Sequence, residues 1–208
     1  MKSAVAVIVG SFNPVQKAHI YLGQNVLQQF PQIRKVIYVP VSNMYQKGEL
    51  LDSEYRYQIL RVACNSLEQF QVSRVEIDEK KQLYTYQTMA LLQQRYPNDE
   101  LYLVIGSDNL KEFDTWKHYR TILRRYHLIV FTRNQDNLAE FMKSNPNIAK
   151  YQDRIFLILN NQYLHVSSTE VRRRIQLGLD FQDLVPEEVY QYLKKDNRYQ
   201  IEKEKRVC

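Results

Sequence analysis

Short apolar runs recur along the chain. They are separated by longer segments in which apolar residues recur at helical spacing among polar ones. Residues 4–9 form a continuous run of small and β-branched apolar side chains, which is typical of a strand buried on both faces of a parallel sheet. Residues 72–77 instead alternate apolar and polar side chains, as a half-buried strand does. Further strands are predicted at residues 36–39, 101–105, 128–132 and 155–159.

Helical periodicity fills most of the intervals between these runs. In residues 18–30 apolar positions recur at helical spacing, and Pro31 then ends the pattern. The next helix is expected to begin at Ser53, whose hydroxyl is suited to capping its N-terminus. The predicted helices occupy residues 18–30, 53–67, 84–96, 169–177 and 186–194.

The alternation of strands and helices predicts an α/β protein with an open, mainly parallel sheet and helices on both of its faces. We expect a single domain of residues 1–193, in which about residues 161–193 form a small C-terminal helical appendage. The tail of residues 194–208 is rich in Lys, Arg and Glu and is expected to be a solvated, fraying end. Ligands of such sheets bind at the carboxyl ends of the strands, where this sequence places its most unusual segments.

Composition and charge narrow the class of protein. Hydrophobic residues make up 44% and charged residues 25% of the 208 residues, which excludes a disordered or fibrous chain. The net charge of +6 favours an anionic partner such as a nucleotide, a nucleic acid or an acidic membrane surface. The early apolar run is too short to span a bilayer, and Cys64 and Cys208 form neither a disulfide framework nor a metal motif. We therefore expect a cytoplasmic protein with Cys64 in its core.

Residues 10–19, with the sequence GSFNPVQKAH, follow the first predicted strand and open the first helix. Free backbone N–H groups and the helix dipole make such a position favourable for a phosphate. Gly10 would let the main chain approach the phosphate, Pro14 would stiffen the loop, and His19 would direct an imidazole donor at the same place. The alternative is an ordinary strand-to-helix turn with His19 merely exposed, and the motif alone does not decide between them.

Residues 166–172, with the sequence VSSTEVR, combine hydroxyl side chains at a helix start with Arg172 one turn later. A Ser or Thr cap and a guanidinium make a second anion site, because a guanidinium can bind phosphate through two parallel hydrogen bonds. Two such sites on one sheet favour a polyphosphate ligand. The alternative is a capped helix followed by a solvated basic run at residues 172–174.

The pairing of GSFNPxxxxH with VSSTxVR resembles the nucleotidyltransferase superfamily, whose signatures are GxFxPxHxGH and ISSTxxR. Three further segments resemble, more narrowly, the nicotinate or nicotinamide mononucleotide adenylyltransferases. These are residues 83–89 (LYTYQTM), 105–116 (IGSDNLKEFDTW) and 184–189 (LVPEEV). The segments follow the family's order from about residue 5 to residue 193, and the resemblance implies a Rossmann-like sheet.

The resemblance implies adenylyl transfer from ATP to nicotinate or nicotinamide mononucleotide, giving a dinucleotide and pyrophosphate in NAD biosynthesis. The acceptor's own phosphate would be the nucleophile, so catalysis would rest on positioning and on charge stabilisation. Mg²⁺ would be held mainly by phosphates and water rather than by protein ligands. The expected partners are therefore small molecules rather than a membrane or a nucleic acid, and a homo-oligomer is left open.

The same resemblance divides the site residues into groups. The expected catalytic residues are His19, Lys47 and Arg172. ATP is expected to bind Gly10, Ser11, Phe12, His19, Gly106, Asp108, Ser168, Thr169 and Arg172. The mononucleotide is expected to bind Asn13, Lys47, Thr85 and Trp116. In this assignment Trp116 stacks on the pyridine ring and Thr85 recognises its carboxylate or amide.

Two departures from the family pattern bear on rate and on substrate. Bacterial members usually carry His where this chain has Gln16, although a Gln can still donate a hydrogen bond to phosphate. Asn13 replaces the commoner Asp, which together with residues 45–48 favours the amide mononucleotide. Residues 84–89 and 113–116 favour nicotinate mononucleotide, so the sequence leaves the choice open.

Three other functions compete with this interpretation. A sister nucleotidyltransferase of the phosphopantetheine or cytidylyl type would share the two phosphate motifs but would not need Trp116. A nucleotide sensor that lost turnover with the change at Gln16 would bind ATP without releasing pyrophosphate. A basic nucleic-acid binder would rest on the net charge and residues 172–174 alone, and its binding would depend steeply on salt.

Overall fold

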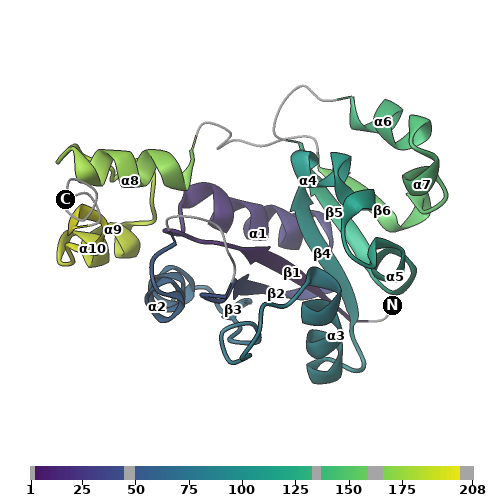
Figure 1. Ribbon diagram of the computed structural model, residues 1–208, viewed down its shortest axis with the longest axis horizontal. Coiled ribbons are helices and arrows are strands. Elements are labelled where there is room, and N and C mark those ends of the chain that lie inside the picture. Colours follow the sequence, from purple (N-terminus) through teal and green to yellow (C-terminus); the bar gives the residue numbers. More distant parts are fainter. Residues whose placement is uncertain (1–2, 45–49, 133–136, 159–165, 202–208) are drawn as a thin grey trace.

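The computed structural model describes residues 3–44, 50–132, 137–158 and 166–201. In this part of the chain, six strands form one sheet in the order β3-β2-β1-β4-β5-β6, and every neighbouring pair is parallel (Figure 1). The prediction of an open, parallel α/β sheet is confirmed. The strands are β1 (Ala4–Gly10), β2 (Ile33–Pro40), β3 (Phe70–Val72), β4 (Glu100–Gly106), β5 (His127–Phe131) and β6 (Ile155–Ile158).

Helices cover both faces of the sheet (Figure 1). The longer ones are α1 (Lys17–Gln29), α2 (Ser53–Cys64), α3 (Thr85–Arg95), α8 (Ser168–Gln176) and α9 (Glu187–Lys194). The shorter ones are α4 (Ser107–Lys111), α5 (Tyr119–Arg125), α6 (Leu138–Ser144), α7 (Pro146–Ala149) and α10 (Arg198–Ile201). Two single 3₁₀ turns cover Phe113–Thr115 and Gln152–Arg154. Within the described residues, no helix is both long enough and apolar enough to cross a membrane.

Strand β1 lies in the middle of the sheet and separates two apolar cores. Its alternate residues Ala4, Ala6 and Ile8 pack with α1, α2, α8 and α9. Val5 and Val7 point the other way, into a core shared with α3, α5 and α6. Successive side chains of a strand point to opposite faces, so a continuous apolar run is what a central strand requires.

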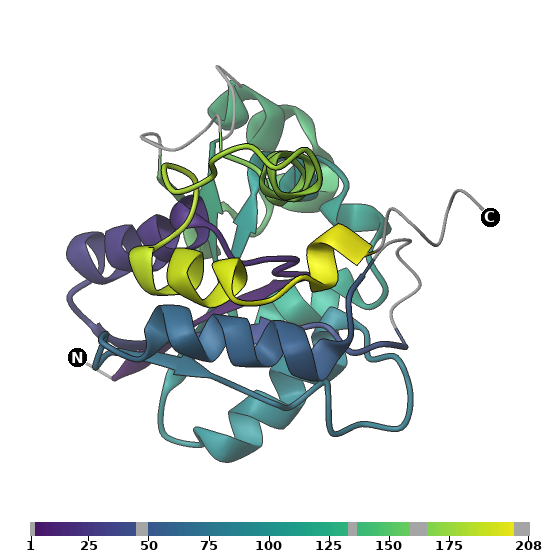
Figure 2. The same cartoon turned by 90° about the vertical axis from the view of Figure 1, so that its left-hand side faces the viewer.

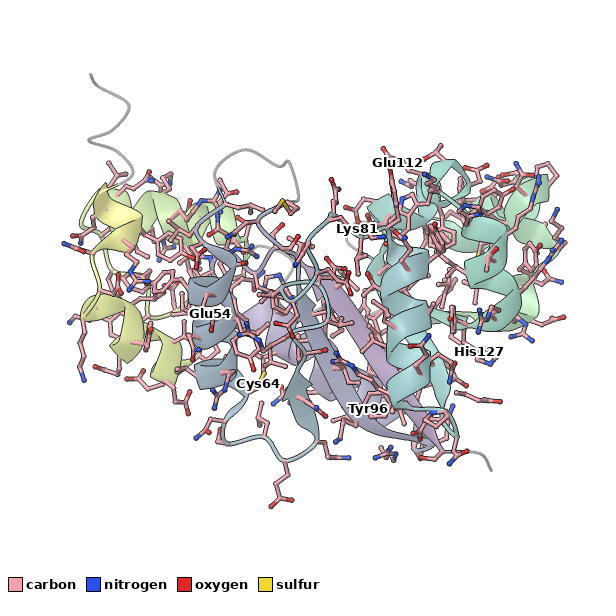
Figure 3. All side chains as sticks on the ribbon, turned by 60° about the horizontal axis from the view of Figure 1, so that its bottom comes forward. Glu54, Cys64, Lys81, Tyr96, Glu112 and His127 are labelled. Carbon is pink, nitrogen blue, oxygen red and sulfur yellow. The ribbon has the colours of Figure 1, made fainter. Side chains whose placement is uncertain are left out.

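The carboxyl and amino ends of the strands lie at opposite edges of the molecule. Figure 3 shows Glu112, which follows β4 and α4, at one edge, and Tyr96 and His127, which precede β4 and begin β5, toward the other. The loops that follow β1, β2 and β4 therefore share one edge of the sheet. These loops contain the segments that the sequence singles out.

The predicted strand at residues 72–77 is wrong, because β3 ends at Val72. The backbone N–H of Ser73 donates the last ladder bond, 2.8 Å from the Tyr38 carbonyl oxygen, and its hydroxyl then accepts from the N–H of Val75 at 3.3 Å. A serine that bonds the backbone two residues on starts a turn. The alternating pattern beyond it buries Val75 and Glu76 without forming a strand.

The start of α2 also differs in detail from the prediction. Asp52, not Ser53, caps this helix, and its Oδ1 accepts from the backbone N–H groups of Glu54 (3.0 Å) and Tyr55 (3.2 Å). A carboxylate at this position satisfies N–H groups that lack helical partners and complements the helix dipole. The same helix ends at Cys64, which lies in the core as expected, and burial raises the pKa of its thiol to about 12 (Figure 3).

The C-terminal helices gather beside α1 and α2, where α9 packs alongside α2 (Figure 2). The expectation of a solvated tail from residue 194 is wrong for its first part. Tyr199 is only 1% exposed, and the guanidinium of Arg198 lies 4.1 Å from the centre of the Tyr55 ring. The burial of Tyr199 and the contact of Arg198 with Tyr55 hold this segment against the protein.

Candidate active site

The loop between β1 and α1 brings Phe12 beneath the ring of His19. Phe12 has a φ of 43° and a side chain buried in the core. A Cβ on Gly10 would lie 3.1 Å from the Phe12 ring, so a residue without a side chain suits this position. The Phe12 and His19 rings meet edge to face, with centroids 5.0 Å apart. Phe12 thus supports the imidazole, and with its ring buried it could reach ATP only through its backbone.

Gln16 caps α1 and fixes the orientation of His19. The Gln16 Oε1 accepts from the backbone N–H of Ala18, and the Gln16 backbone N–H donates to His19 Nδ1 at 3.2 Å. Because Nδ1 accepts, the neutral imidazole carries its proton on Nε2. The ring is therefore oriented with a donor on the side away from its own backbone. The hydroxyl of Tyr38 donates to the His19 carbonyl oxygen at 3.0 Å, which anchors this turn to β2.

The two signature segments are hydrogen-bonded to each other. Ser168 Oγ donates to the Pro14 carbonyl oxygen, and Arg172 Nη1 to that of Asn13, both at 2.8 Å. The amide nitrogen of Gln16 donates to the Val166 carbonyl oxygen at 3.2 Å. The structure thus joins segments about 150 residues apart into one unit at the carboxyl end of β1.

Arg172 differs from the two arginines that follow it. Arg173 and Arg174 donate to the carboxylate of Glu170 at 2.7 and 3.0 Å, whereas the guanidinium of Arg172 turns to the loop and to Thr169 Oγ1 (3.3 Å). The hydrogen bonds from both arginines lower the pKa of the Glu170 carboxyl to about 2. Of the three consecutive arginines, Arg173 and Arg174 are therefore neutralised by Glu170 on the surface of α8, and Arg172 binds the loop after β1.

A fully buried arginine that sequence reasoning missed holds the loop from its other side. Arg56 on α2 donates to the carbonyl oxygens of Ser11 (2.6 Å), Leu51 (2.7 Å) and Val41 (2.7 Å). Burial lowers the pKa of this guanidinium, but an arginine stays charged in proteins. Its bonds tie the loop after β1 to both ends of the loop after β2. The available signal was an arginine in the apolar stripe of an amphipathic helix.

The residues expected to hold the pyridine ring lie on neighbouring segments. Thr85 begins α3, and Trp116 follows the 3₁₀ turn after α4, half-buried with its ring centroid 4.9 Å from that of Phe113. Tyr86 follows Thr85 and His118 lies two residues after Trp116, and the centroids of their rings are 4.4 Å apart. The structure therefore brings the two segments together.

The two remaining expected contacts after β4 differ in exposure. Gly106 ends β4 and pairs with Phe131 of β5, and Asp108 lies in the first turn of α4 with its side chain exposed. Gly106 occupies the N-cap position of that helix. Lys47 lies outside the described residues. Ser11 is half-buried in the loop, where its carbonyl oxygen faces Arg56.

A buried carboxyl group, that of Glu76, contacts α3 and was not predicted from the sequence. The hydroxyl of Thr88 donates to Glu76 Oε1 at 2.6 Å, and both residues are buried. Burial raises the pKa of Glu76 to about 7, opposed by the Thr88 hydrogen bond and by the charge of Arg56. The group lies near Thr85, three residues before Thr88 on the same helix.

Comparison with known proteins identifies the family. The cytidylyltransferase-like family matches residues 7–174. A protein of Moorella thermoacetica named "Probable nicotinate-nucleotide adenylyltransferase" is 34% identical over 199 residues, which cover 94% of this chain and 91% of that protein. One of Clostridium tetani with the same name is 28% identical over 196 residues, which cover 93% of this chain and 98% of that protein.

Solved structures agree on the fold. Plasmodium falciparum nicotinic acid mononucleotide adenylyltransferase complexed with NaAD matches with a TM-score of 0.75 at 19% identity, over 95% of this chain and 97% of that one. The same enzyme complexed with APC gives a TM-score of 0.74 at 18% identity, over 96% and 98%. With the family match and the relative from Moorella thermoacetica, the conclusion is that this chain belongs to the cytidylyltransferase-like family and, within it, to the nicotinate-nucleotide adenylyltransferases, which are nucleotidyltransferases.

Proposed function

We propose that the protein transfers the adenylyl group of ATP to nicotinate mononucleotide, giving the dinucleotide and pyrophosphate. The observation that carries this proposal is the unit formed by the two signature segments around His19. The names of the relatives favour the acid over the amide mononucleotide. Substrate preference is thus the part of the proposal that depends on those names.

The proposed reaction needs no protein nucleophile. An oxygen of the mononucleotide's 5′-phosphate forms a bond to the α-phosphorus of ATP, and the bond from that phosphorus to the oxygen bridging the β-phosphorus breaks. Pyrophosphate leaves with the electron pair of that bond. Because the attacking phosphate is already ionised, no proton has to be removed from it. The protein contributes positioning and charge stabilisation, as is usual in transfer at phosphorus.

His19 is the proposed donor to the charge that develops on the ATP phosphates. Its Nδ1 accepts from the Gln16 backbone, which directs the Nε2 proton outward. The Phe12 ring packed against the imidazole reduces its freedom to turn. A preorganised donor costs no reorganisation during the reaction, which is why such groups stabilise transition states well.

Ser168, Thr169 and Arg172 are proposed to bind the β- and γ-phosphates at the start of α8. Ser168 would do so through its backbone N–H, because its hydroxyl donates to the Pro14 carbonyl oxygen. The Arg172 guanidinium has five N–H donors, and its described bonds to Asn13 and Thr169 come from Nη1 and Nη2. The same side chain can therefore hold the loop and contact a phosphate. We place Lys47 on the mononucleotide side, as the resemblance implies.

Trp116 and Thr85 are proposed to hold the pyridine ring and its carboxylate. The packing of Trp116 on Phe113 fixes one face of the indole and leaves the half-buried ring as a platform for stacking. Thr85 is the first residue of α3, where its backbone N–H has no partner within the helix. A carboxylate is well suited to that position.

We place Mg²⁺ on the phosphates of ATP, so that it enters with the substrate. Among the described residues, no group of three or more His, Cys, Asp or Glu side chains is placed to hold a metal ion. The donors around the loop are instead hydroxyls, an imidazole and a guanidinium, which suit phosphate oxygens. The ion would neutralise charge on the leaving pyrophosphate.

A substrate panel tests the proposal. The purified protein is given ATP and Mg²⁺ with nicotinate mononucleotide, nicotinamide mononucleotide or phosphopantetheine, while pyrophosphate release is followed and products are separated by chromatography. Turnover with nicotinate mononucleotide, at a kcat/KM at least roughly tenfold above that for the amide, supports it. Preference for phosphopantetheine identifies a sister nucleotidyltransferase. ATP binding without pyrophosphate release from any acceptor identifies a sensor.

A further inference from the structure

We propose that Tyr199, in the C-terminal segment, is a positioning residue of the mononucleotide site and acts through the side-chain amide of Asn13. The Tyr199 hydroxyl donates to Asn13 Oδ1 at 3.0 Å. Both residues are buried, with 1% of Tyr199 and 3% of Asn13 exposed. The inference rests on the proposed function only in naming the ligand at Asn13.

Tyr199 and the backbone of Leu51 together hold the amide of Asn13 in one orientation. Its Oδ1 accepts from Tyr199 and also from the backbone N–H of Leu51, 3.4 Å away. The Leu51 N–H can only donate, so its partner atom is the amide oxygen, and the Tyr199 hydroxyl is the second donor to that oxygen. The amide nitrogen is therefore directed away from Leu51, and rotating the amide by half a turn would place its N–H groups against the Leu51 N–H.

Asn13 is held at its main chain as well as at its side chain. Its carbonyl oxygen accepts from Arg172 of α8, while its side chain accepts from Tyr199 of α10. These helices pack against each other in the C-terminal part of the fold (Figure 2). The loop position proposed to contact the mononucleotide is thus set by two separate elements from the end of the chain.

The position of Tyr199 is itself built by packing. The centroid of its ring lies 6.0 Å from the centroid of the Tyr55 ring on α2, and the guanidinium of the neighbouring Arg198 lies over the Tyr55 ring. Asp196 Oδ1 accepts from the Arg198 backbone N–H at 2.9 Å, which starts α10. The hydroxyl is therefore presented to Asn13 by a defined turn of helix that is docked on α2.

The variant Tyr199→Phe tests the role with little change in shape, because it keeps the ring and removes the hydroxyl. The expected result is a rise in KM for nicotinate mononucleotide of roughly 5- to 10-fold, which corresponds to the loss of one net hydrogen bond. The KM for ATP and the kcat should stay within about twofold of the wild-type values. The matched control is Tyr190→Phe. The Tyr190 hydroxyl donates to Asp180 Oδ1 at 2.9 Å within the same helical part and makes no contact with the loop among its described bonds.

A second readout uses no substrate. Hydrogen exchange of a peptide covering residues 11–17 is compared among wild type, Tyr199→Phe and Tyr190→Phe. Faster exchange in Tyr199→Phe alone, with the raised KM, supports the proposal. Equal exchange in all three proteins overturns it, and so does an equal rise in KM for both substrates. If wild type turns over no pyridine mononucleotide, the proposed function fails, while the exchange comparison still decides whether Tyr199 holds the loop.

Discussion

The amide nitrogen of Gln16 donates to the carbonyl oxygen of Val166 at 3.2 Å, which joins the start of α1 to the segment before α8. The oxygen of the same amide caps α1 through the N–H of Ala18. The residue that departs from the family pattern is thus part of the framework of the site. One of the two N–H donors of this amide is used for the link to Val166, and its oxygen is used for the cap, so we assign Gln16 to the framework and catalysis to His19.

Replacing Gln16 by Ala is expected to lower the free energy of unfolding by about 1–3 kcal/mol, because the variant loses a helix cap and leaves a buried carbonyl without its donor. Urea denaturation followed by circular dichroism measures the change. The control is Gln24→Ala, an exposed position inside α1, where a change within about 0.5 kcal/mol is expected. Equal stability of the two variants would contradict the structural role of Gln16.

Replacing His19 by Asn separates the two sides of the imidazole. The Asn oxygen can still accept from the Gln16 backbone, as Nδ1 does, but nothing replaces Nε2. We expect kcat to fall by roughly 10²-fold with unchanged stability, the usual loss for one preorganised donor. His19→Gln, which keeps a donor at the far end, should retain more activity in the same pyrophosphate assay. Near wild-type kcat in His19→Asn would remove this residue from the mechanism.

Trp116→Ala is expected to raise KM for the mononucleotide by roughly tenfold and to spare KM for ATP, because a stacking platform binds only one of the substrates. Steady-state kinetics with each substrate varied in turn measures the split. Tyr119→Ala is the control, since Tyr119 packs against the same apolar core as Trp116. Equal losses for both substrates, or the same result from the control, would assign Trp116 a packing role only.

Glu76 is expected to make stability depend on pH. Burial raises the pKa of Glu76 from 4.5 to about 7, so the folded protein holds a proton that the unfolded chain releases. The free energy of unfolding should therefore fall as pH rises from about 4.5 to 7, by up to about 3 kcal/mol, and the contribution should be constant above that.

The variant Glu76→Gln tests this dependence, because it keeps an oxygen for the Thr88 hydroxyl and cannot ionise. The free energy of unfolding of this variant, measured in urea at several pH values, should not show the decrease between pH 4.5 and 7 that is assigned to Glu76. Glu68→Gln, which removes an exposed carboxylate, is the control. Parallel profiles for wild type and Glu76→Gln would show that Glu76 does not titrate in this range.

The sheet was predictable because the apolar sequence of each long strand is itself typical of a buried strand. Continuous apolar runs such as residues 4–9 can be satisfied only between two layers of helices. Residues 72–77 look like a strand because they mix apolar and polar side chains, but a turn there buries the adjacent residues Val75 and Glu76. Ser73 decides between these outcomes through its hydroxyl, and that bond depends on where the strand is placed against Tyr38.

The site was predictable only where its residues form motifs. His19 and Arg172 belong to short signatures, and their proximity follows from the carboxyl edge of the sheet. Arg56 could not be placed in this way, because the carbonyl groups that it binds belong to three separate loop positions. Tyr199 lies in a charged segment whose composition indicated exposure to solvent, and its burial depends on contacts with Tyr55 and Asn13 that are distant in the sequence.

In the proposed reaction the phosphate of the mononucleotide attacks the α-phosphorus of ATP directly, while the unit around His19 holds the substrates. The most direct test is a single turnover with ATP labelled at the α-phosphate and excess nicotinate mononucleotide, quenched over time. The label is expected to appear in the dinucleotide as ATP is lost, with none on the protein at any time. Label that first accumulates on the protein, or never enters the dinucleotide, would contradict it.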